Sequence, residues 1–345
     1  MQIHRSSIAD ILKTSKQMVI DGSMSTALER MGVDMNHKLW TARALVECPE
    51  NVKQVHKNYF KAGADCGITC SYQATIPRLR EMGFTEREAE DAVSKSVELF
   101  LEARQEWWQE EGEKAGRSWP LCLAGIGPYG AYLADGSEYR GHYGVSREVL
   151  RTFHERRIHL LWEAGADLLL FETQPSLEEA LIEAEIAEEL GADYWISFSC
   201  RDGRHINEGG SIADCARTLA QGHPHLRMLG VNCTKPGYIN SLLRELKGAA
   251  ELPIGVYPNS GEEYDPVTKT WHGAADGKSF QDYALSYFQN GAAAVGGCCT
   301  TAEEHVRQTA QARAEFQRSG CRPMMRDRFR CNRQESGTNF KEIDD

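Results

Sequence analysis

The stretch EAGADLLLFET, residues 163–173, joins the end of a helical segment to a run of apolar residues. Gly165 stands where a helix commonly ends, because glycine accepts the left-handed conformation that lets the chain reverse. The run after it is almost continuously apolar, which is typical of a parallel strand covered on both faces. The same junction recurs in KAGADCG (61–67), ELGADYW (189–195) and QNGAAAV (289–295). This repetition predicts helices that alternate with parallel strands.

Eight such apolar runs are spread along the chain, and segments of helical periodicity separate them. The runs cover residues 18–22, 64–72, 121–128, 167–173, 194–200, 226–234, 253–259 and 292–299. Eight strands with eight crossovers are the count of a (β/α)8 TIM barrel. A doubly wound open sheet has the same alternation, but no G-x-G-x-x-G follows the first strand. We therefore expect a single-domain α/β barrel over residues 1–318 and a polar, loosely ordered tail over 319–345.

The composition is that of an ordinary globular protein, with 41% hydrophobic and 26% charged residues among 345. The net charge of -11 argues against nucleic acid or an anionic membrane as partner. No stretch approaches the ~20 apolar residues of a membrane span, and the start of the chain lacks the apolar core of a secretory signal. We expect a cytoplasmic protein that acts on small molecules. No extended pairing segment is evident, so we expect a monomer.

The residues that end the strands of a barrel converge on one mouth, where barrel enzymes build their sites. In this chain they are Asp21, Gly22, Ser71, Tyr72, Glu172, Asn232, Cys233, Asn259, Cys298 and Cys299. Two long loops, 127–146 and 259–279, follow the third and seventh strands on the same side. The sequence therefore predicts a functional site at this mouth.

Three of the eleven cysteines differ from the rest by their position at the mouth. An odd count without C-x-x-C spacing argues against a disulfide framework, and most of the cysteines are expected to be small buried apolar residues. Cys233, Cys298 and Cys299, however, end the sixth and eighth strands, and three thiolates suit a catalytic zinc ion. Each of them alone could still be a buried apolar residue, and Cys298 with Cys299 could form a strained vicinal disulfide.

Two glycines precede the adjacent cysteines in AVGGCCTT, residues 294–301. Neighbours in a regular strand point to opposite faces, so Cys298 and Cys299 can share one metal ion only if the strand breaks there. Gly296 and Gly297 would permit this break through backbone angles and close approaches that larger residues resist. The order Thr301-Ala-Glu-Glu304 predicts a capping box that starts the next helix directly.

A set of motifs spread over about residues 15–315 resembles the homocysteine S-methyltransferases. The motifs are IDGSMSTALE, SYQATIP, GPYGAYLADGSEYRG, FET, ISFSC, GVNCT, VYPNSGEEYD and GGCCTT. Members of this family are zinc-dependent (β/α)8 enzymes, and the two loop motifs resemble the branch that uses S-methylmethionine. The resemblance implies methyl transfer from a sulfonium donor, S-methylmethionine or S-adenosylmethionine, to the thiol of L-homocysteine, which gives methionine.

The resemblance also implies roles for individual residues. Cys233, Cys298 and Cys299 match the zinc ligands, while Asp21, Gly22 and Glu172 match positions that hold the amino acid part of homocysteine. Ser71 and Tyr72 are expected to line the same pocket, and Asn232 and Asn259 to orient a substrate. Other roles remain open, because Asp21 could cap a helix, Glu172 could pair with an arginine, and the asparagines could be structural. The chain departs from many relatives at Ser23, where they have a second glycine.

The implied mechanism needs no general base, because a zinc-bound thiol is deprotonated by the metal, and no histidine is assigned a role. Aromatic rings could hold the sulfonium by cation–π contact, and the candidates are Tyr129, Tyr132, Tyr139, Tyr143 and Trp271. The alternatives are a betaine- or folate-dependent enzyme of the same family, or a barrel that binds zinc or a metabolite without catalysis.

Overall fold

The computed structural model describes residues 7–34, 41–261, 263–265, 270–272 and 277–320, with the backbone alone in 263–265 and 270–272. The predicted barrel strands are all present within this part of the chain. They are β1 (Met18–Val19), β2 (Cys66–Ile68), β3 (Leu121–Ile126), β4 (Leu168–Gln174), β5 (Tyr194–Phe198), β6 (Leu226–Asn232), β7 (Ile254–Tyr257) and β10 (Ala294–Val295). An additional antiparallel pair, β8 (Glu263–Asp265) and β9 (Thr270–His272), lies in the loop after β7.

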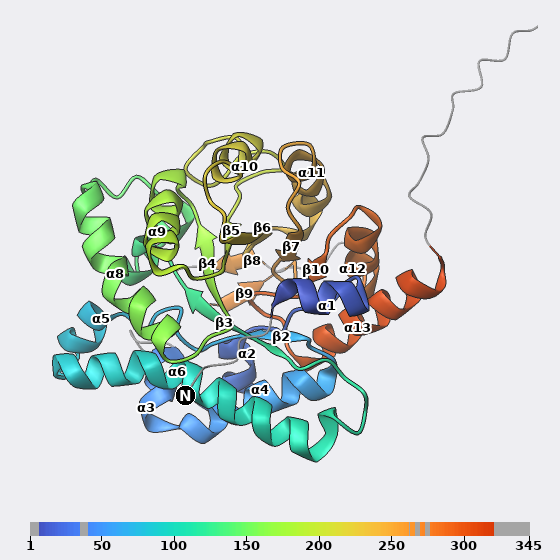
Figure 1. Cartoon of the computed structure of the whole chain (residues 1–345), viewed down its shortest axis with the longest axis horizontal. Helices are drawn as coiled ribbons and strands as arrows, with labels where there is room; N and C mark the ends of the chain where they lie inside the picture. The colour runs from blue at the N-terminus through green and yellow to red at the C-terminus, as the bar shows by residue number, and fades with distance from the viewer. Residues whose placement is uncertain (1–6, 35–40, 262, 266–269, 273–276, 321–345) are drawn as a thin grey trace, which may run out of the picture.

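The eight strands form one parallel sheet in the order β1-β10-β7-β6-β5-β4-β3-β2. The two ends of this order meet, because Ile20 forms a parallel bridge with Cys66 and the Asp65 amide donates to the Val19 carbonyl over 2.8 Å. The sheet therefore closes into a ring, which Figure 1 shows surrounded by helices. This confirms the (β/α)8 barrel.

Helices follow the strands and cover the outside of the ring. The long helices of the crossovers are α4 (Pro49–Ala62), α6 (Glu86–Trp107), α8 (Arg147–Glu163), α9 (Leu177–Leu190), α10 (Ile212–Leu219), α11 (Pro236–Lys247), α12 (Phe280–Gln289) and α13 (Glu303–Arg318). The shorter helices are α1 (Ile8–Ser15), α2 (Met24–Arg30) and α3 (Thr41–Glu47), which precede α4, and α5 (Ile76–Glu81), the π-helix η1 (Trp108–Gly112), α7 (Tyr129–Leu133) and the 3-10 helix η2 (Ser137–Tyr139), which follow it.

The strand side chains alternate between two cores. Leu121, Leu123 and Trp195 belong to the cluster inside the ring, whereas Cys122 and Ala124 belong to the larger cluster between the ring and the helices. This alternation follows from the period of two in a β-strand. Because both faces are buried, the strands read as continuous apolar runs, as the sequence indicated.

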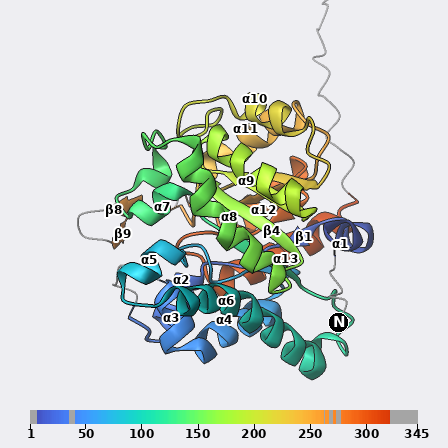
Figure 2. The ribbon, with the colours of Figure 1, turned by 60° about the vertical axis from the view of Figure 1, so that its left-hand side comes forward.

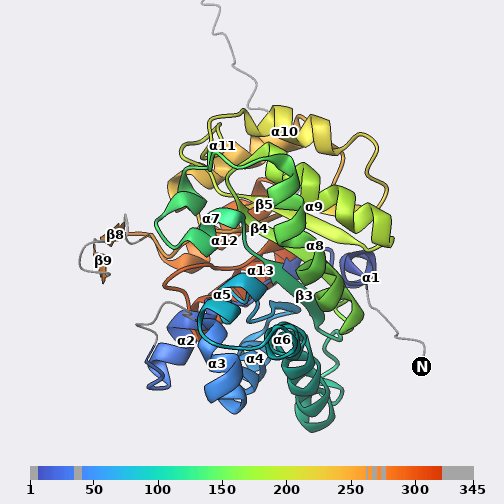
Figure 3. The same cartoon turned by 90° about the vertical axis from the view of Figure 1, so that its left-hand side faces the viewer.

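Helix α1 closes one end of the ring. Its buried residues Ile8 and Ile11 pack into the inner cluster with Met18 and Ile20. The β8–β9 pair projects from the opposite side of the barrel, together with α7 (Figures 2 and 3). One end of the barrel is thus plugged by α1, and the other is left to the loops that follow the strands.

The chain ends are described only in part. Helix α13 ends at Arg318 and the description stops at Gly320, so the tail over 321–345, including Cys321 and Cys331, lies outside the described residues. The boundary between barrel and tail remains a prediction. In the described part of the chain, no helix combines the length and the apolar character needed to cross a membrane.

Candidate metal centre and substrate pocket

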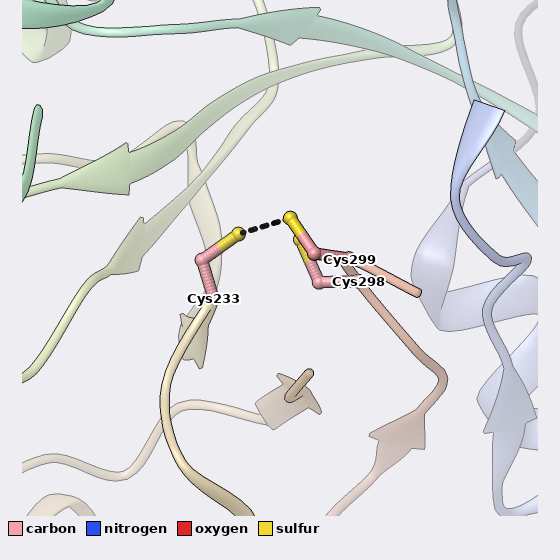
Figure 4. A group of neighbouring side chains, drawn as sticks. All are labelled: Cys233, Cys298 and Cys299. Carbon is pink, nitrogen blue, oxygen red and sulfur yellow. Dashed lines mark hydrogen bonds between the residues drawn. The ribbon is translucent and has the colours of Figure 1, made fainter. Parts of the chain in front are cut away.

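Cys233, Cys298 and Cys299 gather at the mouth of the barrel. The three Sγ atoms all lie within 4.8 Å of one another, and those of Cys233 and Cys299 are 3.7 Å apart. Figure 4 shows the Cys233 thiol approaching the other two from the opposite side of a gap. Other described cysteines, such as Cys66 and Cys122, are buried in the core as the sequence predicted. The cluster is one that could hold a metal ion.

The backbone around the cluster adopts uncommon conformations. Thr173, Cys233 and Thr300 have positive φ angles of 59°, 45° and 63°. Non-glycine residues rarely enter this region, and doing so costs on the order of 1–3 kcal/mol. The unusual angles therefore fall on the residues that form the site. Gly296 and Gly297 are not among the residues with positive φ, so our expectation that these glycines provide the unusual angles is wrong.

Gly296 is needed for a close approach instead. A Cβ atom on this residue would lie 2.6 Å from the Cβ of Ile20 and 2.9 Å from the carbonyl oxygen of Asp21. These two neighbours follow directly after β1, the strand that pairs with β10 at its side in the ring. The missing side chain thus lets the end of β10 press against β1 just before the two cysteines.

The helix after the cysteines starts later than expected. Helix α13 begins at Glu303 with Ala302 as its N-cap residue, so the predicted capping box on Thr301 is wrong. The Thr301 hydroxyl instead donates to the carbonyl of Cys298 over 2.6 Å. This bond closes a turn over the cysteine pair, so Thr301 supports the site. The N-cap of α13 is the next residue, Ala302.

The three thiols influence one another's protonation. Hydrogen bonds from Cys298 and Cys299 hold the pKa of Cys233 well below its usual range. The interaction with Cys233 in turn raises the pKa of Cys298 and of Cys299. One thiolate held by two thiols is the stable state of such a cluster when no cation is near, and ionising all three requires a positive charge between them.

A pocket opens beside the thiols, and its walls are mainly apolar and aromatic. Tyr72, Tyr139 and Tyr257 line it together with two carboxyl groups, those of Glu138 and Glu172. Among its described lining residues there is no lysine, arginine or histidine. The pocket therefore combines acidic groups and thiols with no compensating base, which favours ligands that carry positive charge.

Two of the predicted substrate residues are buried carboxyl groups. Asp21 Oδ2 accepts from the Ile68 amide over 2.9 Å, while its Oδ1 is buried without a hydrogen-bond partner in the described part of the protein. Glu172 Oε2 accepts from the Tyr257 hydroxyl over 3.3 Å. Burial raises the pKa of both carboxyl groups well above the usual range of a carboxyl. For Glu172, repulsion by the charge of Cys233 raises the pKa further. Both groups would be stabilised by an ammonium ion.

The alternative roles considered for these two residues do not match their contacts. The N-cap of α2 is Ser23, whose hydroxyl accepts from the Thr26 amide over 3.3 Å, so Asp21 does not cap that helix. Glu172 accepts a hydrogen bond from the hydroxyl of Tyr257, and not from an arginine among the described residues. Gly22 lines the pocket, and a side chain there would meet the ring of Tyr59 at 3.0–3.1 Å.

Like Asp21, three other predicted residues are not part of the pocket lining. The Ser71 hydroxyl donates to the Gly125 carbonyl over 2.7 Å inside the protein. Asn232 is fully buried, and its Oδ1 accepts from the Thr173 amide and from the Ser197 hydroxyl, each over 2.8 Å. Asn259 Oδ1 is also buried, without a partner among the described residues. Direct substrate contact by Ser71, Asn232 or Asn259 remains a prediction, whereas the support that Asn232 gives to Thr173 is observed.

Most of the aromatic candidates pack within their own loop. The Tyr129 ring contacts those of Tyr132, Tyr143 and Phe153, and the Tyr132 ring also contacts Phe153, with centroids 5.0–5.7 Å apart. Tyr139 lines the pocket and leaves 42% of its surface exposed, although its hydroxyl interacts with Cys233. Trp271 lies in β9, whose side chains are outside the described part of the protein. Tyr139 is thus the loop tyrosine best placed to face a ligand.

Among the pocket residues that the sequence analysis did not identify are Glu138, Thr173 and Tyr257. Tyr257 could have been found, because it is the last inward-facing residue of the seventh apolar run. Thr173 follows Glu172 at a register shift between β4 and β5, which sequence periodicity does not reveal. Glu138 sits in the middle of a long loop, where no strand end marks it.

The sequence profile of the homocysteine S-methyltransferase family matches residues 18–313. This range covers every strand of the ring and all three clustered cysteines. The chain belongs to the homocysteine S-methyltransferase family. Methyl transfer to homocysteine is the activity of that family, and the chain is an enzyme of this class.

Named homocysteine S-methyltransferases are similar over nearly their full length. The homocysteine S-methyltransferase YbgG of Bacillus subtilis is 48% identical over 88% of this chain and 96% of its own. The selenocysteine methyltransferase of Astragalus bisulcatus is 39% identical over 87% of this chain and 94% of its own. Among solved structures, the metallated form of the homocysteine methyltransferase MmuM from Escherichia coli has a TM-score of 0.78 at 37% identity, covering 88% of this chain and 99% of that one.

Proposed function

We propose that this homocysteine S-methyltransferase holds a zinc ion on Cys233, Cys298 and Cys299 and methylates homocysteine from a sulfonium donor such as S-methylmethionine. The observation that carries the proposal is that three clustered thiols line a pocket with two carboxyl groups. Among the described residues that line this pocket there is no lysine, arginine or histidine. The metallated state of the similar MmuM enzyme is consistent with a metal at this position.

The thiol geometry supports zinc. Sulfur ligands lie about 2.3 Å from zinc, so two of them in a tetrahedral arrangement are about 3.8 Å apart. The Cys233 and Cys299 sulfur atoms are 3.7 Å apart, close to that value before any ion is placed. Three protein ligands leave a fourth position for a substrate. When bound, zinc would act as a Lewis acid that lowers the pKa of a coordinating thiol.

Asp21 and Glu172 fit the ammonium group of homocysteine. Both carboxyl groups are buried at the strand ends, and one oxygen of Asp21 has no partner among the described residues. A charge-assisted hydrogen bond to an ammonium would satisfy it and would favour the ionised form of each carboxyl. The amino acid part of homocysteine is then held beside the thiol cluster. Gly22 leaves room for it, since a side chain would already touch Tyr59.

The reaction removes charge from the pocket. A homocysteine thiolate and a sulfonium become two neutral thioethers, so the pocket must bind two charged reactants and release two products whose sulfur atoms are neutral. An environment poor in water favours such charge neutralisation. On the pocket wall Tyr257 is buried and Tyr72 is half-buried, and both rings help to exclude water. The remaining task is to align thiolate, methyl group and leaving sulfur, which is a matter of positioning.

The first experiment measures zinc content and homocysteine-dependent methyl transfer in the wild type and in Cys298→Ala. We expect about one zinc per chain in the wild type, and loss of zinc with a fall in activity of at least ~10³-fold in the variant, because two ligands remain and the thiol pKa is no longer lowered. Cys48→Ser is the matched control, since Cys48 is half-buried and is not part of the cluster. Full activity in a zinc-free Cys298→Ala variant would overturn the proposal.

A donor panel tests the second part of the proposal. S-methylmethionine carries a net positive charge, whereas betaine is a zwitterion of zero net charge and a folate is an anion. The described pocket lining has acidic groups and no base, so it favours the donor with the net positive charge. We expect turnover with S-methylmethionine and little or none with betaine or a methylfolate. Activity with betaine alone would contradict the proposal of a sulfonium donor. Absence of activity with every donor would favour a barrel that binds zinc or a metabolite without catalysis.

A reducing compartment such as the cytoplasm would keep the three thiols available for the metal. Small molecules are the partners that the pocket suits, and we expect the enzyme to act as a monomer. Light scattering on the purified protein checks the last point, and a mass of two or more chains would contradict it.

A further inference from the structure

Glu138 is an acidic residue of the pocket to which the proposed binding of homocysteine assigns no role. It lies in η2, on the loop after β3, and lines the pocket together with Tyr139. Asp21 and Glu172, the carboxyl groups suited to homocysteine, belong to β1's continuation and to β4. Glu138 therefore approaches the same cavity from a separate wall.

The loop holds Glu138 in a defined place. The backbone of η2 packs so closely on α7 that a Cβ atom on Gly130 would lie 2.5 Å from the Glu138 amide nitrogen. The Glu138 carbonyl accepts from the Ser199 hydroxyl over 3.4 Å. The Asp135 carboxylate accepts from the Ser137 amide over 2.9 Å. Contacts to α7, to β5's end and within the turn thus set the direction of the Glu138 side chain.

The Glu138 carboxyl has an unmet need for a partner. Its Oε2 is buried and forms no hydrogen bond in the part of the chain that the structure describes. A buried carboxyl without a partner is destabilising unless a ligand satisfies it. Glu138 and the thiols also face the same cavity, because Glu138, Cys233, Cys298 and Cys299 all line the pocket. A cation placed between Glu138 and the thiol cluster would satisfy both.

We propose that Glu138 recognises the positive charge on the sulfur of the methyl donor. The inference rests on the proposed function and adds a specificity residue to it. The thiol first releases its proton to solvent. In the transfer, the thiolate supplies the electron pair of the new S–CH3 bond, and the pair of the breaking C–S bond returns to the donor sulfur, which becomes a neutral thioether. The attraction to Glu138 exists for the donor and disappears in the product.

This chemistry predicts which kinetic constant Glu138 controls. The donor's charge is greatest before the reaction and is partly lost in the transition state, so a carboxylate stabilises the bound donor more than the transition state. Removing its charge should weaken donor binding without slowing the chemical step. It should also leave product release unhindered, because methionine never makes this contact through its sulfur.

The test compares the wild type with Glu138→Gln. We expect the KM for S-methylmethionine to rise about tenfold or more, while kcat and the KM for homocysteine stay within about twofold. Glu138→Asp, which keeps the charge, should recover part of the loss. Asp135→Asn is the matched control on the same loop, because it removes an exposed charge while keeping the acceptor for Ser137, and it should leave all constants unchanged.

A neutral analogue separates the sulfonium from the donor's own ammonium group. In 2-amino-5-methylhexanoate a CH group replaces the positively charged sulfur of S-methylmethionine. The ratio of its inhibition constant to the donor KM should be high in the wild type and should fall about tenfold in Glu138→Gln. Equal weakening of analogue and donor would show that Glu138 binds the ammonium, and an unchanged donor KM would also overturn the proposal. Wild-type turnover with S-methylmethionine tests the proposed function by itself, so the two can fail separately.

Discussion

At the scale of single residues, three non-glycine residues in or beside the thiol cluster have left-handed backbone conformations. Thr173, Cys233 and Thr300 each adopt a positive φ that is unfavourable for a non-glycine residue. Asn232 holds the first of them, with bonds of 2.8 Å from the Thr173 amide to Oδ1 and from its own Nδ2 to the Thr173 hydroxyl. A residue that the sequence suggested as a substrate contact therefore supports Thr173, which lines the pocket beside the thiols.

The pairing of Glu172 with homocysteine can be tested at this scale. Glu172→Gln keeps the size and the acceptor for Tyr257 but removes the charge available to an ammonium. We expect the KM for homocysteine to rise by about 10–100-fold, because hydrogen bonds to charged groups contribute about 1.5–3 kcal/mol. Steady-state kinetics at saturating donor measure it.

An acceptor without the ammonium group provides the control for Glu172. The wild type should use 4-mercaptobutanoate far less well than homocysteine, and Glu172→Gln should lose most of that discrimination. If the variant still distinguishes the two thiols as strongly as the wild type, Glu172 does not hold the ammonium. The zinc content should remain that of the wild type throughout.

At the scale of elements, the end of β10 decides whether two adjacent cysteines can serve one site. The strand is two residues long, and the chain then passes beside Ile20 and Asp21 without room for a side chain at Gly296. Bonds from the Cys298 amide to the Pro258 carbonyl over 2.8 Å and from the Thr301 hydroxyl to the Cys298 carbonyl fix the turn that follows. Close packing between two strands, rather than glycine flexibility, thus shapes the cysteine turn.

Gly296→Ala should disturb this turn. The added Cβ would lie 2.6 Å from the Ile20 Cβ and 2.9 Å from the Asp21 carbonyl oxygen, so the backbone of β1 or β10 must move. We expect a loss of about 1–3 kcal/mol in the free energy of unfolding, together with weaker zinc binding. Denaturant unfolding and zinc titration measure the two effects.

The matched control is Gly237→Ala in the first turn of α11. A Cβ atom at Gly237 would meet no atom within 4 Å, and alanine favours the helix. This variant should be as stable as the wild type or slightly more stable. Unchanged zinc affinity and stability in Gly296→Ala would contradict the role given to the close approach.

At the scale of the whole molecule, the fold buries an ionisable group that is not part of the pocket lining. His56 of α4 is fully buried against Phe60 and Phe100, and neither ring nitrogen has a hydrogen-bond partner in the described part of the protein. Burial lowers the pKa of His56 to about 3. Unfolding returns the residue to a pKa near 6.5, so the unfolded chain binds a proton that the folded chain excludes.

His56 should therefore make the fold sensitive to acid. Below pH 6.5 and down to about pH 3, this residue alone should lower the free energy of unfolding by about 1.4 kcal/mol per pH unit, because its folded pKa is depressed. His56→Phe removes the titration and fills the same apolar space. Unfolding at pH 7 and pH 5 should show a difference between variant and wild type that changes by about 2 kcal/mol. Identical pH dependence in both proteins would contradict the assignment.

The sequence was sufficient for the eight strands, their parallel order and the position of the three thiols. Continuous apolar runs separated by amphipathic segments are local patterns, and eight of them are the count of a closed barrel; the absence of a G-x-G-x-x-G after the first strand argued against the open sheet that has the same alternation. The end of β6 carries Cys233 and the end of β10 leads into Cys298 and Cys299, so the barrel had to bring them to one mouth. The same convergence predicted the positions of Asp21 and Glu172 at the strand ends, whereas the roles proposed for them rest on the family resemblance.

Only the tertiary structure decided how the site is supported and what else faces the pocket. The close approach at Gly296, the turn closed by Thr301 and the bonds from Asn232 to Thr173 join segments that are distant or irregular in sequence. Glu138 reaches the pocket because its loop packs on α7 and meets Ser199. Periodicity records which residues share a face of an element, but contacts between elements depend on the packing of the whole chain, which no local pattern contains.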